Sequence, residues 1–286
     1  MRLDRRPICQ HRRTMSVTIL TGPLGTELHR RGVETPLPGW SAHALQVAPD
    51  AVRAIHSAYA DAGATVHVTN TFRTKSRTFP NEWDELARTA VRLCREGIPE
   101  SQRVAGSIAP LEDCYRPDLA PDDPREEHRE LAQVLAGAGC DVLLCETFPH
   151  VGEGWIAVEE AVRTGVETWA SFTAGPNADL LTPKELREAA RGAIERGASS
   201  VFVNCVPAAR TLDYVRELSQ LGVSFGAYAN AGAPDDGFGW KSDPGEPERY
   251  ADVAQTWVEA GATFIGSCCG TGPEHIAALA RRFGWR

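Results

Sequence analysis

The sequence has 286 residues, 42% of them hydrophobic, and a formal net charge of −8 at neutral pH. This length suits one large barrel or two ordinary domains. The acidic balance argues against a nucleic-acid partner and against binding to an anionic membrane surface. No apolar run approaches the length of a membrane span. We therefore expect a soluble protein with neither a nucleic-acid nor a membrane partner.

The N-terminal segment differs from the rest of the chain. Residues 1–15 contain five arginines but no apolar segment, so they do not resemble a secretory signal. Met15 directly precedes the first predicted strand and is a second candidate for the start of translation. We expect residues 1–15 to form a disordered arm and residues 16–286 to form one folded domain.

Segments typical of strands and helices alternate along the remaining sequence. An eighth apolar strand begins at Ala262 and must end before a pair of adjacent cysteines. The seven strands before it are predicted at 17–22, 64–72, 104–110, 141–148, 168–174, 200–206 and 224–230. The helices are predicted at 49–62, 82–96, 124–138, 154–164, 183–196, 208–221, 247–260 and 273–282.

Eight strand–helix units with apolar strands predict parallel pairing in an α/β fold. In a chain of this length they favour a closed (β/α)8 TIM barrel with a single domain. A glycine follows the helix before each even-numbered strand, where a left-handed cap is expected. These glycines are Gly63, Gly139, Gly197 and Gly261. The long irregular segments 31–46, 111–123 and 231–246 all follow strands and are expected over one rim.

Polar residues stand at the carboxyl ends of the predicted strands, where TIM barrels carry their chemistry. Glu146 follows an apolar run and is expected to face a pocket, although a salt bridge at the rim is an equal alternative. The full set is Thr21, Asn70, Ser107, Glu146, Asn204 with Cys205, Asn230, and Cys268 with Cys269.

Cysteines occur at the ends of two strands. Adjacent side chains of a strand point to opposite faces, so Cys268 and Cys269 can share a metal ion only if the chain bends. Gly266 and Gly270 are expected to permit that bend. Together with Cys205, the pair forms a candidate zinc site with an open fourth position. A buried cysteine without any ligand role is the alternative for Cys205. The eight cysteines do not resemble a secreted disulfide scaffold, and thiolate ligands need a reducing compartment, so we expect a cytoplasmic protein.

These segments resemble the homocysteine S-methyltransferase family of zinc-dependent barrels. The resemblance extends from Ile19 to Ile276, and its most specific parts are the last strand end and the segment that ends at Cys205. The matching segments are 21–28, 62–64, 69–72, 106–108, 146–147, 203–205, 230–232, 266–271 and 273–276.

The resemblance implies the roles of several residues. It implies zinc bound by Cys205, Cys268 and Cys269, with Asn230 beside the metal. It implies that Glu146 holds the ammonium group of the thiol substrate. Thr21 stands where the family has a second carboxylate for that ammonium group, which puts strict homocysteine specificity in doubt. Thr21, Asn70, Ser107 and Asn230 complete the expected substrate site.

The function implied is methyl transfer from a cationic or corrinoid donor to the thiol of homocysteine, which gives methionine. The sequence leaves the donor open among S-methylmethionine, S-adenosylmethionine, a betaine and a separate corrinoid protein. Two alternatives remain at this point. One is a zinc-binding barrel without turnover that acts as a partner subunit, and the other is a methyltransferase for a different thiol.

Overall fold

A computed structural model describes residues 17–231 and 245–284. The predicted arm at 1–15 and its boundary at residue 16 lie outside these residues, as does most of the predicted loop at 231–246. No helix in the described part of the chain is long and apolar enough to cross a membrane.

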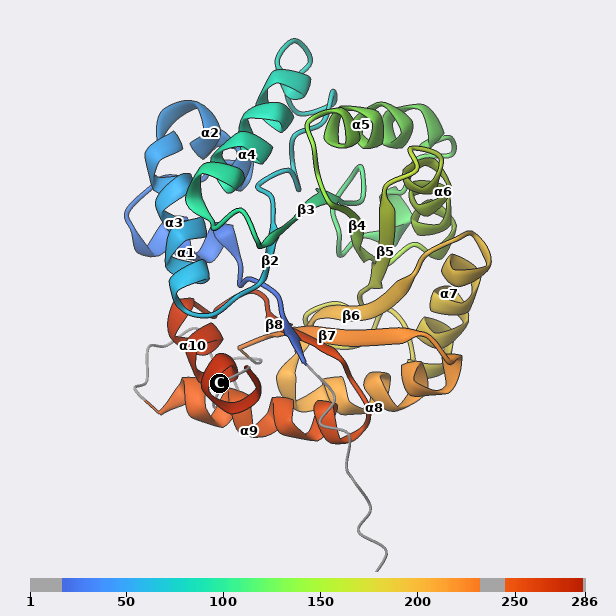
Figure 1. The fold of residues 1–286 in the computed structure, drawn as a ribbon. Helices are drawn as coiled ribbons and strands as arrows, with labels where there is room; N and C mark the ends of the chain where they lie inside the picture. The colour runs from blue at the N-terminus through green and yellow to red at the C-terminus, as the bar shows by residue number, and fades with distance from the viewer. Residues whose placement is uncertain (1–16, 232–244, 285–286) are drawn as a thin grey trace, which may run out of the picture.

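Eight parallel strands form one sheet in the order β1-β8-β7-β6-β5-β4-β3-β2. An isolated bridge between Leu20 and Val66 connects the two outer strands, supported by a hydrogen bond from the Thr65 amide to the Ile19 carbonyl (2.8 Å). The sheet therefore closes, which confirms the predicted (β/α)8 barrel (Figure 1). The strands are β1 (Thr18–Ile19), β2 (Val66–Val68), β3 (Arg103–Ile108), β4 (Val142–Phe148), β5 (Glu167–Phe172), β6 (Ser200–Pro207), β7 (Ser224–Asn230) and β8 (Phe264–Ser267).

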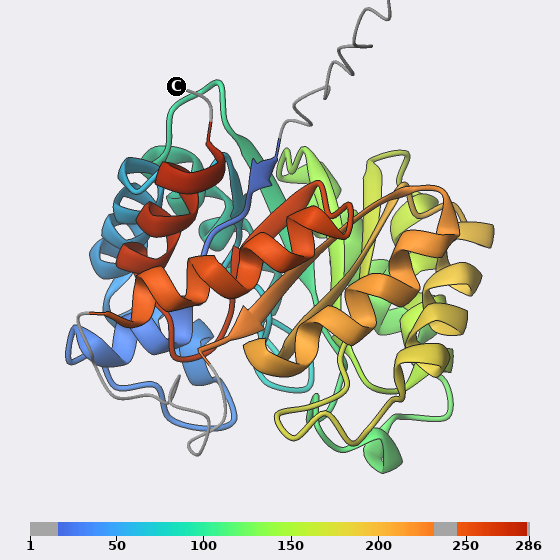
Figure 2. The same cartoon turned by 90° about the horizontal axis from the view of Figure 1, so that it is seen from below.

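The helices surround the strands as an outer layer (Figure 1). They are α1 (Leu24–Arg30), α2 (Ala44–Val47), α3 (Pro49–Asp61), α4 (Trp83–Gly97), α5 (Arg125–Gly137), α6 (Val151–Val162), α7 (Pro183–Glu195), α8 (Ala208–Leu218), α9 (Glu246–Glu259) and α10 (Pro273–Phe283), with short 3-10 turns at Trp40–His43, Pro117–Leu119 and Ser219–Leu221. The loops that follow β1, β3 and β5 lie along the lower rim in Figure 2.

The structure differs from the sequence prediction after the first two strands. Helix α1 was not predicted, and β2 ends at Val68, although the predicted strand continued to residue 72. Beyond Val68 the backbone folds into a tight turn, in which the Thr71 amide donates to the Thr69 carbonyl (2.8 Å). This turn directs Asn70 toward the carboxyl rim of the barrel, where it lines a cavity.

The barrel interior below the rim is filled by apolar and aromatic side chains. Trp169 packs against Phe202 and Phe264, with ring centroids 5.5 Å and 4.9 Å apart. This inner cluster also contains Leu20, Val66, Ala105, Val142, Leu144 and Tyr228. A second, larger apolar layer lies between the strands and the helices. The inner cluster therefore fills the barrel below the rim.

The glycines before the even-numbered strands have φ angles between +87° and +105°, which confirms the predicted left-handed caps. Gly266 has a different role from the one predicted. It lies inside β8, where a Cβ would come within 2.9 Å of the Cβ of Leu20. Gly266 therefore allows close packing within the barrel, whereas Gly270, with a φ of +83°, forms the bend.

Candidate active site

A cavity of about 300 Å³ opens at the carboxyl ends of the strands. Its wall combines the loops after β1, β2 and β3 with the ends of β4, β6, β7 and β8. Six of the residues singled out in the sequence line it: Thr21, Asn70, Glu146, Cys205, Cys268 and Cys269. Ser107 and Asn230 are not part of the wall, although both are buried at the ends of their strands.

The three cysteines meet in one wall of this cavity. The sulfur atoms of Cys205, Cys268 and Cys269 all lie within 4.8 Å of one another. Three sulfurs at about 2.3 Å from a tetrahedral zinc ion would be roughly 3.8 Å apart, so this arrangement fits the ion after small adjustments. The donor set also fits, because soft thiolates are preferred zinc ligands. The fourth side of the site faces the cavity.

The turn that carries the cysteine pair is fixed by its neighbours. Because β8 ends at Ser267, neither Cys268 nor Cys269 is held in the strand. The Cys268 amide donates to the Ala229 carbonyl (2.7 Å), and the Cys269 carbonyl accepts from the Ala231 amide (2.9 Å). These bonds to the end of β7 orient both thiols toward Cys205.

Helix α1 supports the other side of the same turn. The Gly270 amide donates to Thr26 Oγ1 (3.2 Å), and Arg30 Nη2 donates to the Gly270 carbonyl (3.0 Å). Thr271 Oγ1 lies 2.8 Å from Ser267 Oγ and 2.7 Å from the Cys268 carbonyl. The unpredicted helix therefore has a clear role in holding the cysteine pair.

The distorted ends of β6 and β4 set the directions of the Cys205 and Glu146 side chains. Cys205 has a φ of +52° and Thr147, which follows Glu146, has a φ of +64°. The pairing of β4 and of β6 with the next strand shifts register at these points. Left-handed backbone at residues other than glycine costs about 1–3 kcal/mol at each position. The surrounding structure must therefore compensate.

Asn204 provides much of that compensation. Its Oδ1 accepts from the Thr147 amide (3.2 Å) and from Ser171 Oγ (2.6 Å), and its Nδ2 donates to Thr147 Oγ1 (2.7 Å). The side chain is fully buried. Asn204 thus joins the end of β6 to the ends of β4 and β5, and fixes the relative position of Cys205 and Glu146.

We expect Asn204→Ala to destabilise the metal-free protein by about 2–4 kcal/mol, because buried polar groups of Thr147 and Ser171 lose their partner. Urea unfolding monitored by circular dichroism measures this change. Zinc affinity should fall as well, since Cys205 loses its fixed backbone. Asn81→Ala is the control, because Asn81 is exposed in the turn before α4. A loss below about 0.5 kcal/mol, comparable to that of an ordinary surface substitution, would contradict this role.

In the absence of a metal ion, the pKa values of the cysteine thiols are shifted in opposite directions. Hydrogen bonds from Cys205 and Cys268 to the Cys269 sulfur hold the pKa of Cys269 well below its usual value. Contact with Cys268 and Cys269 raises the pKa of Cys205, with burial as a further cause. A lowered thiol pKa favours the thiolate form, which is the form that binds a divalent ion.

Glu146 is a buried carboxylate at the end of β4, only 7% exposed. Its Oε1 accepts from Ser107 Oγ (2.5 Å) and its Oε2 accepts from Tyr228 Oη (3.0 Å). Burial raises the pKa of Glu146 to about 7, while these two hydrogen bonds act in the opposite direction. No cationic side chain in the described part of the chain pairs with it. The cavity thus contains an acidic group without a countercharge.

The other predicted residues have supporting positions. Ser107 contacts Glu146 rather than the cavity. Thr21 Oγ1 accepts from the Val68 amide (3.2 Å), and Asn70 Nδ2 donates to the Ser41 carbonyl (2.8 Å). Asn230 precedes Ala231, whose amide binds the Cys269 carbonyl. Asn230 is therefore close to the cysteine turn but outside the cavity wall.

Sequence reasoning missed several residues of the wall, including Trp40, Arg73, Tyr115 and Tyr228. Tyr115 lines the same cavity as the three cysteines. Tyr228 could have been found by strand alternation, since it lies two residues before Asn230 in β7. Trp40, Arg73 and Tyr115 lie on loops, where no periodic pattern predicts which side chains point inward.

The chain is similar to several known proteins. A family model described as homocysteine S-methyltransferase matches residues 18–283. Homocysteine S-methyltransferase 1 from Zea mays is 28% identical, with coverage of 92% of this chain and 93% of the relative. Selenocysteine methyltransferase from Astragalus bisulcatus is 26% identical, with coverage of 91% and 90%. The metallated form of the homocysteine methyltransferase MmuM from Escherichia coli superimposes with a TM-score of 0.77 at 25% identity, with coverage of 93% and 96%.

Proposed function

Because this chain belongs to the homocysteine S-methyltransferase family, we propose that it transfers a methyl group to the thiol of homocysteine and thereby forms methionine. The new S–CH3 bond forms on the acceptor sulfur while the donor's bond to the same methyl group breaks, and the thiol proton leaves to solvent. One observation carries this proposal. Three converging thiols and a buried carboxylate without a countercharge line the same cavity.

We propose that Cys205, Cys268 and Cys269 hold zinc, as the fit of their sulfur atoms supports. Bound there, zinc would supply a fourth ligand position at which a substrate thiol loses its proton at neutral pH while remaining nucleophilic. The protein's own contribution is to fix the three sulfurs through the Gly270 turn and Asn204, so that the acceptor thiol has one position in the cavity.

Glu146 is proposed to bind the ammonium group of homocysteine. A buried carboxylate needs a cationic partner to be stable in its ionised form. Ser107 and Tyr228 hold its two oxygens in place, so the ammonium group meets a fixed acceptor. With both the sulfur and the ammonium group held, the acceptor is oriented for in-line attack on a methyl donor.

The remaining wall is suited to a cationic donor. Trp40 and Tyr115 are aromatic residues of the cavity wall, and the faces of such rings attract cationic methyl groups. A sulfonium such as S-methylmethionine or S-adenosylmethionine therefore fits better than a neutral donor. A betaine and a separate corrinoid protein remain candidates for the same assay. The reducing conditions that free thiols require favour the cytoplasm as the location.

The decisive experiment supplies zinc-loaded full-length protein with homocysteine and, in turn, trideuteromethyl-labelled S-methylmethionine, S-adenosylmethionine and glycine betaine, with methylcobalamin tested in parallel. Mass spectrometry measures labelled methionine. We expect transfer from one of the sulfonium donors in amounts far above the zinc-free control. Tight homocysteine binding without transfer from any donor would contradict the proposal and favour a non-catalytic partner subunit.

A second candidate is methyl transfer to a different thiol or to a selenol. Thr21 favours this candidate, because its hydroxyl adds no negative charge beside Glu146 for an ammonium group. The similarity to a selenocysteine methyltransferase points in the same direction. The assay decides between the two when selenocysteine, cysteine and homocysteine compete as acceptors. A higher kcat/KM for an acceptor other than homocysteine would establish the second candidate.

A further inference from the structure

Arg73 brings a positive charge to the cavity wall. It lies on the loop after β2, three residues beyond Asn70, and lines the same cavity as Glu146 and the cysteines. Its Nη1 donates to the Glu112 carbonyl (3.2 Å), and its guanidinium lies 5.7 Å from the centre of the Phe72 ring. These contacts position the group between two loops without neutralising its charge. Its Nε is buried and has no hydrogen-bond partner among the described residues.

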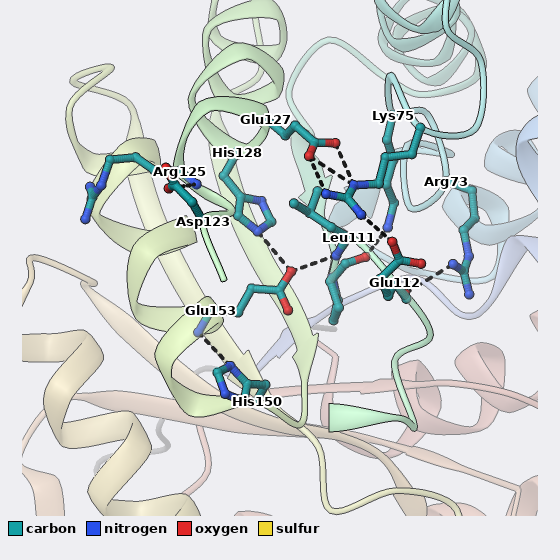
Figure 3. Close-up of polar contacts among 12 residues, drawn as sticks. Arg73, Lys75, Leu111, Glu112, Asp123, Arg125, Glu127, His128, His150 and Glu153 are labelled. Carbon is teal, nitrogen blue, oxygen red and sulfur yellow. Dashed lines mark hydrogen bonds and ion pairs between the residues drawn. The ribbon is translucent and has the colours of Figure 1, made fainter. Parts of the chain in front are cut away.

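The carboxylates of Glu112, Glu127 and Glu153 are bound to other groups (Figure 3). The Glu112 and Glu127 side chains both pair with Arg77. Glu153 accepts from the Leu111 amide (2.7 Å) and contacts His128 (3.2 Å).

Two further charged groups lie near Arg73. Asp113 also lines the cavity, but its Oδ1 accepts from the Tyr115 amide (2.8 Å). Lys75 donates to the Pro110 carbonyl, and burial lowers its pKa to about 7, with the nearby charge of Arg73 as the next cause. Across residues 17–231 and 245–284, no carboxylate lies within 4.0 Å of the Arg73 guanidinium as an ion pair.

Among the described residues of the cavity wall, Glu146 and Arg73 carry opposite charges and neither has an ion-pair partner, while the carboxylate of Asp113 is held by the Tyr115 amide. A partly buried charge without a countercharge is costly unless a ligand supplies one. Amino acids carry both an ammonium and a carboxylate group. A planar guanidinium is well suited to a carboxylate, because its N–H groups match both carboxylate oxygens.

From this arrangement we propose that Arg73 binds the carboxylate of an amino-acid substrate in the cavity. The inference deepens the proposed function, on which it rests, by assigning a residue to the carboxylate of the amino-acid substrate. The carboxylate belongs either to the thiol acceptor or to a donor such as S-methylmethionine. The chemistry at Arg73 is the same in both cases, and the two arms of the experiment distinguish them.

The acceptor arm measures thiol binding by calorimetry on zinc-loaded full-length protein, without any donor. The probes are homocysteine and 3-mercaptopropylamine, which is homocysteine without its carboxylate. We expect Arg73→Met to weaken homocysteine binding by about tenfold to a hundredfold, as for a lost charged hydrogen bond. Binding of 3-mercaptopropylamine should change by less than about twofold, since it has no group for Arg73. Arg73→Lys should restore part of the homocysteine affinity because it keeps the charge.

The donor arm measures the KM of S-methylmethionine and of dimethyl(3-aminopropyl)sulfonium, which lacks the carboxylate, at saturating acceptor. If the carboxylate belongs to the donor, Arg73→Met should raise the KM of S-methylmethionine by about tenfold to a hundredfold and leave kcat unchanged. The KM of the carboxylate-free sulfonium should then stay the same. Arg116→Gln is the matched control, because Arg116 lies on the neighbouring loop, pairs with Asp118 and is absent from the cavity wall. It should leave both arms unchanged.

The two hypotheses fail in different ways. The inference is overturned if Arg73→Met affects each carboxylate-containing probe and its carboxylate-free analogue equally, because Arg73 then has only a structural role. The proposed function is overturned by absence of methyl transfer in the wild-type protein. The acceptor arm is independent of turnover, so it tests Arg73 even in that case.

Discussion

Replacing Cys205 by serine is expected to abolish both high-affinity zinc binding and methyl transfer. A serine hydroxyl is a much poorer zinc ligand than a thiolate at neutral pH. Zinc sites with four protein ligands bind the ion with a free energy of roughly 10–16 kcal/mol, so one thiolate contributes about 3 kcal/mol. The loss of one thiolate therefore lowers zinc affinity on the order of a hundredfold or more. Turnover should fall below detection, because the acceptor thiol is then neither deprotonated nor positioned.

The fold should survive this change. Serine is close in size to cysteine and keeps the left-handed backbone found at this position. Zinc content by mass spectrometry, urea unfolding and labelled methionine formation are measured on the same samples. Cys140→Ser is the control, since Cys140 packs between the helices and strands, away from the site. Full methyl transfer by the Cys205 variant would show that the cysteine cluster does not activate the thiol.

The cysteine cluster was predictable from sequence because its geometry is encoded locally. Two adjacent cysteines can face one ligand only in a turn, and the turn forms at Gly270, as its φ of +83° shows. Cys205 stands at the end of another apolar run, and parallel strands in a barrel bring such ends together at one rim. The closed barrel followed from the same repeated pattern and is confirmed by the bridge between Leu20 and Val66.

The parts that could not be predicted depend on long-range contacts. Ser107 was expected in the substrate site, but its hydroxyl is directed to Glu146, a residue 39 positions away. Arg73 has no ion-pair partner among the described residues and is held by the carbonyl of Glu112, 39 positions away, which no local pattern reveals. Helix α1 was missed because it is short, and its purpose becomes visible only through its bonds to Gly270.

Glu146→Gln is expected to weaken homocysteine binding by about tenfold to a hundredfold at pH 8, since a neutral amide replaces the countercharge of the ammonium group. Calorimetry on zinc-loaded protein measures this change. 4-Mercaptobutyrate, which lacks the amine, should bind the two proteins alike. Glu100→Gln, at an exposed site before β3, is the control. An equal loss of affinity for homocysteine and for 4-mercaptobutyrate would indicate that Glu146 maintains the structure and does not bind the ammonium group.

The same substitution should stabilise the metal-free protein at pH 8. The pKa of Glu146 is about 7 in the folded state, against an ordinary value of 4.5. Between pH 4.5 and pH 7 the carboxyl group of Glu146 is more protonated in the folded state than in the unfolded state. Its contribution to the free energy of unfolding is therefore fully present below pH 4.5 and is lost as the pH rises through 7. The amide of the Glu146→Gln variant is neutral at every pH and avoids this loss, which amounts to at most about 3 kcal/mol. The variant should therefore gain much more stability at pH 8 than at pH 5. Its affinity deficit should shrink below pH 7, because the wild-type carboxylate becomes protonated there. A substitution that stabilises the ligand-free protein and weakens ligand binding indicates that the protein buries this charge for the ligand.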